Sequence, residues 1–148
     1  MRKLILPLTA AAALCLGAGC ASEEEIAMAN AVTTALPEEI KGCKFMGDVD
    51  VGGHATIENA RFSLKLKTAK LGANFLVETH AYAQLLALRS VGVALSGRAY
   101  KCPAGHSLEE GHEEKMQERH AQIKERAVDD MDKMRLRLMD FDNDDYHM

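Results

Sequence analysis

The sequence predicts an α+β protein: a small sheet in the order β-α-β-β with one packed helix, followed by a long C-terminal α-helix. Three observations predict this fold. Residues 42–51 alternate apolar and polar side chains with a period of two, and residues 56–71 carry an apolar stripe at helical spacing. Residues 107–140 carry a second, longer stripe. A chain of 148 residues has room for one such domain.

The first strand is expected over residues 42–51, ending at Gly52 and Gly53. The helix that follows begins after Thr56, whose hydroxyl can cap its first turn. It ends at Gly72, because glycine suits the left-handed residue just past a helix.

Two further strands are expected at residues 75–80 and 91–102, with Gly92 and Gly97 as bulges or points of close packing. The connector 82–90 is unusually apolar for an exposed loop. It is interpreted as an extension of the strands, with a hydrophobic patch for a partner as the alternative.

The long helix is predicted from the capping-box pattern Ser107-x-x-Glu110 to about Asp140, with the acidic stretch 140–145 disordered beyond it. Its length of about 50 Å exceeds the width of so small a domain, so it should project, fold back or pair with another helix. The apolar stripe is predicted to contact a partner through Met116, Ile123, Met131, Met134 and Leu138.

The first 19 residues have the layout of an export signal: a basic start, an apolar run over 4–16, then small residues. Small residues followed by Cys20 resemble the bacterial lipobox, which predicts a lipid on this cysteine. Gly17 stands where the lipobox prefers Leu. The alternative is ordinary cleavage, for example after Ala21, which would discard Cys20.

The chain is thus divided into a lipoprotein signal peptide (1–19), a tether (20–41), an α/β lipoprotein domain (42–103), and a long helix with an acidic tail (104–148). Ala21, rather than Asp, resembles an outer-membrane sorting signal of enterobacterial lipoproteins. We therefore expect a bacterial cell-envelope protein, lipid-anchored in the outer membrane and facing the periplasm. A soluble periplasmic protein is the alternative.

Two cysteines remain, Cys43 and Cys102, and in an oxidising compartment such a pair favours a disulfide. The competing interpretation is a metal site in which Cys102 acts with His106, four residues on. A weaker possibility brings His106 toward His112. The disulfide is the favoured interpretation, and no metal or other cofactor is predicted.

The composition of the chain argues against some classes of function. A net charge of −4, 5% aromatic residues and no Trp argue against a nucleic-acid partner. Asp48 and Asp50 alternate on the polar face of the first strand, which indicates a solvated face rather than a pair of catalytic acids. Since no nucleophile has an evident base, the sequence predicts a protein that is not an enzyme.

Four segments carry a family resemblance: "GCKFMGDVDVGG" from Gly42, "LKTAKLGAN" from Leu66, "FLVETH" from Phe75 and "LSGRAYKCP" from Leu95. They resemble a family of bacterial envelope lipoproteins known as a domain of unknown function. More distantly, they are similar to RcsF, the outer-membrane lipoprotein sensor of the Rcs stress pathway. The resemblance implies an exported lipoprotein with a compact α/β domain in which the first and last segments are joined by their cysteines.

The predicted function is a non-enzymatic, lipid-anchored envelope protein that acts as a protein-interaction or stress-sensing module. It would contact the membrane through its lipid and other envelope proteins through its domain and helix. Two alternatives remain: a soluble periplasmic module that binds a metal or small ligand, and a structural homo-oligomer formed through the C-terminal helix.

Overall fold

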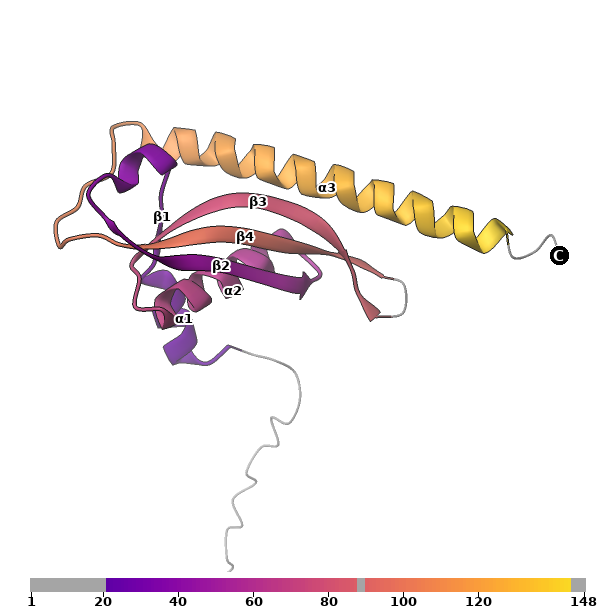
Figure 1. Cartoon of the computed structure of the whole chain (residues 1–148), viewed down its shortest axis with the longest axis horizontal. Coiled ribbons are helices and arrows are strands. Elements are labelled where there is room, and N and C mark those ends of the chain that lie inside the picture. The colour runs from indigo at the N-terminus through magenta and orange to yellow at the C-terminus, as the bar shows by residue number, and fades with distance from the viewer. Residues whose placement is uncertain (1–20, 88–89, 145–148) are drawn as a thin grey trace, which may run out of the picture.

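The computed structural model describes residues 21–87 and 90–144 (Figure 1). The predicted α+β class is confirmed: a four-stranded mixed sheet is accompanied by two shorter helices and followed by one long helix. The elements are α1 (Glu23–Asn30), β1 (Thr33–Thr34), the 3₁₀ helix η1 (Pro37–Ile40), β2 (Lys44–His54), α2 (Ile57–Lys70), β3 (Phe75–Leu85), β4 (Val91–Lys101) and α3 (His112–Asp144).

The sheet has the order β1-β3-β4-β2, with β3 and β4 forming a long antiparallel hairpin. β2 pairs antiparallel with β4, and the two-residue β1 pairs parallel with the start of β3. β2 departs from regular pairing between Phe45 and Gly47 and again between Val51 and His54. The central strands β3 and β4 therefore carry most of the core, while β1 and β2 form the edges.

Local signals explain α2. The Thr56 hydroxyl accepts a hydrogen bond from the Asn59 amide at 3.2 Å, and Gly72 has a φ of 76° just past the helix end. The buried residues of α2 include Ile57 and Leu64, which face the sheet at helical spacing. The predicted start and end of this helix are confirmed.

α2 and α3 pack on the same face of the sheet. Leu64 from α2, Leu76 from β3 and Ile123 from α3 belong to one buried cluster. An ion pair of 3.0 Å between Lys124 and Glu58 joins the two helices at the surface. Figure 1 shows α3 running lengthwise beside β3, so the chain that follows the sheet completes the core of the domain.

The segment predicted as a tether is folded from Glu23 onward. Ser22 and Glu25 form a capping box that starts α1, which packs on α2. Further along, Val32 is 1% exposed and Ala35 is 0% exposed. These short apolar side chains fill space beside the sheet, and the backbone around them pairs with β3. The prediction of a flexible tether up to residue 41 was therefore wrong.

The predicted start of the long helix was also wrong. α3 begins at His112, because Gly111 turns the chain with a φ of 77° and the Glu109 amide is bonded to Glu39. At its other end the helix continues to Asp144, so the described part of the acidic stretch is helical rather than disordered.

Part of the apolar stripe of α3 packs against the core of its own domain. Met116 and Ile123 are buried, and Met131 packs against the same core. Met134 and Leu138 are half-buried. The prediction that the whole stripe contacts a partner was therefore wrong, because the first part of the stripe is covered by the sheet.

The apolar connector extends the strands as far as Leu85, and the Leu86 amide bonds the Ser90 carbonyl to close the hairpin. Gly97 is a point of close packing, as predicted: a Cβ there would lie 2.7 Å from Leu76 Cδ1.

Within the described residues, no helix combines the length and apolar character needed to cross a bilayer. Residues 1–19 and the predicted lipidation site Cys20 lie outside the described residues.

Candidate functional site around the disulfide

A disulfide joins the residue before β2 to the residue after β4, at one end of the sheet. Cys43 precedes β2 and Cys102 follows β4, and the pairing of Lys44 with Lys101 places the two cysteines side by side. Their sulfur atoms are bonded, their Cα atoms are 4.3 Å apart, and 59 positions separate them in sequence. The predicted Cys43–Cys102 pair is confirmed.

Asn74 fixes the backbone on one side of this bond. Its side-chain amide donates to the Cys102 carbonyl at 3.1 Å, and its side-chain oxygen accepts from the Cys102 amide at 2.8 Å. Asn74 ends the turn after α2, so the disulfide is held by the same turn that aligns α2 with β3.

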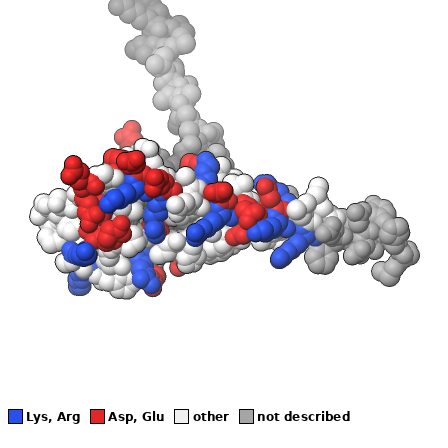
Figure 2. Space-filling view, turned by 90° about the horizontal axis from the view of Figure 1, so that it is seen from above, with Lys and Arg blue, Asp and Glu red and all other residues white. Residues whose placement is uncertain are grey.

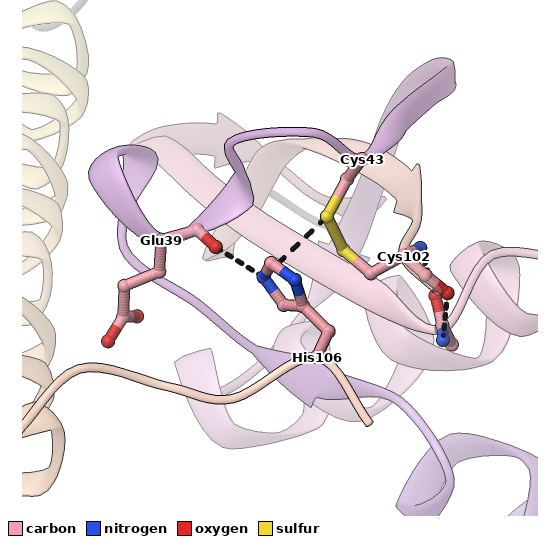
Figure 3. The surroundings of a disulfide bond; sticks show 5 residues. Glu39, Cys43, Cys102 and His106 are labelled. Atoms are coloured by element: carbon pink, nitrogen blue, oxygen red, sulfur yellow. Dashed lines mark hydrogen bonds between the residues drawn. A yellow bond between two sulfur atoms is a disulfide. The ribbon is translucent and has the colours of Figure 1, made fainter. Parts of the chain in front are cut away.

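His106 lies against the other sulfur (Figure 3). Its Nε2 atom is 3.7 Å from Cys43 Sγ and donates to the Glu39 carbonyl oxygen at 2.6 Å. Its ring meets Phe75 edge to face, with centroids 5.3 Å apart. The sulfur atoms of Cys43 and Cys102 and a ring nitrogen of His106 all lie within 4.8 Å of one another. The imidazole is thus held in one orientation beside the disulfide.

Glu39 organises the neighbouring loops. Its buried carboxylate accepts from the Leu36 amide at 2.8 Å, the Glu109 amide at 3.0 Å and His112 Nδ1 at 2.8 Å. Burial raises the pKa of this carboxyl, but the hydrogen bonds from the two amides and from His112 outweigh burial and hold the pKa below its ordinary value of 4.5. A charged Glu39 therefore ties η1 to the segment that leads into α3.

The weaker histidine hypothesis is not supported by this geometry. His106 bonds the backbone carbonyl of Glu39, whereas His112 bonds its carboxylate. Among the described residues, the ligand atoms that come together with His106 are those of the two cysteines, and His112 is not in that group. Of the two metal hypotheses, only the combination of His106 with Cys102 is brought together, and the structure adds Cys43 to it.

A second buried polar cluster joins α3 to the sheet. The Glu78 side chain is 1% exposed, and Arg61 Nε donates to both of its oxygens at 3.1 Å. From α3, Arg119 donates to the Glu78 carbonyl at 2.6 Å, and His120 Nε2 lies 3.6 Å from the carboxylate. Burial lowers the pKa of His120; Glu78 opposes this, while Arg61, Lys65 and Arg119 add to it. This cluster joins α3 to β3, and burial favours the neutral form of His120.

The face of the sheet away from α2 and α3 is open. A hollow of about 490 Å³ is lined there by residues that include Asp48, Asp50, His80 and Arg98. Asp50 accepts a hydrogen bond from Ser96, and exposed Asp48 pairs with exposed Arg98 at 3.5 Å. The two aspartates thus have separate partners, which agrees with a solvated polar face rather than a pair of catalytic acids.

No family model, no curated protein and no solved structure gives a significant match to this chain. The resemblance to envelope lipoproteins therefore stays a prediction.

Sequence reasoning missed Glu39, Asn74 and Glu78. Glu39 stands in the run Pro-Glu-Glu-Ile, where nothing local separates it from exposed Glu38. Glu78 offers one signal, since it is a lone acid inside the apolar strand "FLVETH" and so indicates a buried ion pair.

Proposed function

We propose that this chain is a non-enzymatic, exported cell-envelope protein, anchored in the outer membrane through a lipid on Cys20, that binds other envelope proteins through its domain and the distal part of α3. The observation that carries the proposal is the far end of α3. There Leu136 is 62% exposed and Met139 is 68% exposed, although both are large apolar side chains.

The shape of α3 supports this part of the proposal. Its 33 residues extend over about 50 Å at the usual helical rise. Strands of 11 residues extend over about 36 Å, so the helix outreaches the sheet that it covers. Figure 1 shows its C-terminal end running past the end of β3 and the start of β4. Exposed apolar residues on a projecting helix are typical of a contact with another protein.

The rest of the outward surface of α3 has a different character. Figure 2 shows acidic and basic side chains along it, with acidic ones gathered toward the end where α3 begins. Such a mixed charged surface favours water over an apolar contact. The distal residues Leu136 and Met139 therefore favour a local docking point over an oligomer built along the whole helix.

The disulfide supports an exported protein. Such bonds persist in oxidising compartments and are rare in reducing ones. The position of α1 adds a constraint: its capping residue Ser22 lies two positions after Cys20. A lipid on Cys20 would hold the folded domain directly at the membrane surface instead of on a long flexible leader.

The anchor is tested by growing cells with an alkyne fatty acid and comparing the wild type with Cys20→Ala. We expect the wild type to be labelled and to fractionate with membranes, and the variant to lose both properties. Cys15→Ala is the matched control, because this cysteine lies inside the apolar run and should leave with the signal peptide. Equal labelling of Cys20→Ala and the wild type would exclude the anchor.

The contact is tested by placing a photo-cross-linking residue at Leu136 or Met139 in cells, with the exposed α3 position Glu125 as the control. We expect one discrete adduct from the two distal positions and none from Glu125. An adduct at twice the mass of the chain would identify a homo-oligomer instead. The same set of adducts at all three positions would contradict a specific contact.

A further inference from the structure

We propose that the Cys43–Cys102 pair and His106 form a zinc site when the disulfide is reduced, so that the same three residues serve either as a covalent cross-link or as a metal centre. This inference stands apart from the proposed partner contact. It starts from a cluster in which two sulfur atoms and one ring nitrogen already meet within 4.8 Å (Figure 3).

One distance in this cluster is already close to that of a tetrahedral zinc site. With Zn–S bonds near 2.3 Å and Zn–N bonds near 2.0 Å, a tetrahedral centre places a sulfur about 3.5 Å from the nitrogen and two sulfurs about 3.8 Å apart. Cys43 Sγ and His106 Nε2 are 3.7 Å apart. The two sulfurs are bonded at present, and on reduction they must separate to about the van der Waals distance, which is also about the separation that zinc requires. Reduction of the disulfide therefore brings the two sulfur atoms to about the spacing that zinc requires.

The ligand chemistry selects the class of metal. Two thiolates and one imidazole suit a borderline or soft ion such as Zn²⁺, whereas oxygen ligands would favour Mg²⁺ or Ca²⁺. Three protein ligands leave one position for water or another small ligand. Cys43 is half-buried while Cys102 is 3% exposed, so the site lies just beneath the surface and is reached from the Cys43 side.

His106 is already held for this role. Phe75 packs against its ring, and the hydrogen bond to the Glu39 carbonyl keeps Nε2 directed toward Cys43. Zinc would take the place of the Nε2 proton, which moves to Nδ1, and the Glu39 carbonyl would lose its donor. The edge-to-face contact with Phe75 does not depend on the Nε2 proton, so it remains to orient the ring when zinc is bound.

The redox step balances with a dithiol as the reductant. The dithiol attacks the less buried of the two cysteines at Cys43 Sγ, forming a mixed disulfide and releasing Cys102 as a thiolate. Its second thiol then frees Cys43 and leaves the reductant as a disulfide. In total, two electrons and two protons convert the protein disulfide to two thiols. Zinc binding displaces one proton from each thiol, so binding should weaken as the pH falls.

The test uses the full chain in detergent with Cys15→Ser and Cys20→Ser in every sample, so that Cys43 and Cys102 are its only thiols. The protein is reduced with a phosphine, freed of reductant without oxygen, and titrated with Co²⁺ as a spectroscopic substitute for zinc. We expect one equivalent to give the thiolate-to-cobalt charge-transfer band and the visible bands of a tetrahedral centre. Zn²⁺ should then displace the cobalt. The oxidised protein should give neither band.

His106→Gln should weaken cobalt binding by about tenfold or more, because a ligand is lost. His80→Gln is the matched control, since His80 is exposed on the open face of the sheet, and it should bind as the parent does. Equal affinity of His106→Gln and the parent, or no cobalt bands in the reduced parent, would overturn the proposal.

Circular dichroism accompanies each titration, since reduction removes a cross-link. If the reduced protein loses structure, one equivalent of Zn²⁺ should restore it, because metal binding then supplies folding free energy. A reduced parent that stays unfolded in saturating Zn²⁺ would also overturn the proposal.

Discussion

Replacing Glu39 with Gln should destabilise the domain although the size of the side chain hardly changes. The carboxylate is buried and accepts from the Leu36 amide, the Glu109 amide and His112. Gln keeps one acceptor oxygen but presents an amide NH₂ group to a donor on the other side. At least one buried donor is thereby left without an acceptor.

The size of the effect follows from those contacts. A hydrogen bond to a charged group contributes about 1.5–3 kcal/mol, and a buried donor left unsatisfied costs about 1–3 kcal/mol. One lost acceptor together with the loss of charge at the remaining one gives about 2–4 kcal/mol. For a domain of this size, that loss lowers the melting temperature by about 10 °C.

Urea unfolding followed by circular dichroism measures this, with Glu38→Gln as the control, because Glu38 is exposed on the same turn. The pH dependence adds a second signature. Because the folded protein holds the pKa of Glu39 below 4.5, its contribution is present above pH 4.5 and is lost as the pH falls through the lowered pKa. The wild type and Glu39→Gln should therefore converge in stability toward acid pH.

A free energy of unfolding for Glu39→Gln within about 0.5 kcal/mol of Glu38→Gln at neutral pH would refute the reasoning. So would a difference between wild type and Glu39→Gln that stays constant from pH 7 to the acid limit. In either case, the three hydrogen bonds would not be what ties η1 to the start of α3.

Three further outcomes are expected. Gly97→Ala should lower the free energy of unfolding by about 1–3 kcal/mol, seen as a lower urea midpoint, because its Cβ has no room. Replacing Cys43 and Cys102 together with Ala should cost about 4 kcal/mol in the same assay, as expected for the loop that the disulfide closes. Since burial lowers the pKa of His120 from 6.5, the unfolded chain takes up a proton first, and wild-type stability should fall as the pH drops below 6.5. His120→Gln should flatten that fall in thermal melts, whereas exposed His80→Gln should not.

The sequence predicted those parts of the fold whose signals are local. Thr56 and Gly72 bound α2 in the sequence as they do in the structure, because a cap and a left-handed glycine act within a few residues. α1 was missed although Ser22 and Glu25 are a capping-box pair, since its eight residues carry no apolar stripe long enough to indicate a helix. The capping-box pair Ser22 and Glu25 was the signal in the sequence that could have indicated α1.

The remaining misses involve contacts between distant parts of the chain. Ser107 was predicted to cap α3, but the Glu109 amide bonds Glu39, 70 positions earlier in the sequence, and this contact keeps the turn outside the helix. The disulfide was predicted correctly because few cysteines leave few pairings. Its neighbour Glu39 was not, because three separate segments meet there only after folding.

The two edges of the sheet affect whether copies of the protein can aggregate by pairing strand to strand. Beyond the two residues paired with β1, α3 packs against β3, and its Arg119 donates to the Glu78 carbonyl. The opposite edge, β2, has two breaks in its regular pairing. A foreign strand that needs a regular row of free amides and carbonyls would find the Glu78 carbonyl already bonded on β3 and two breaks in regular pairing on β2. Shortening α3 ahead of Arg119 would free that carbonyl for pairing with another chain as well as removing part of the core.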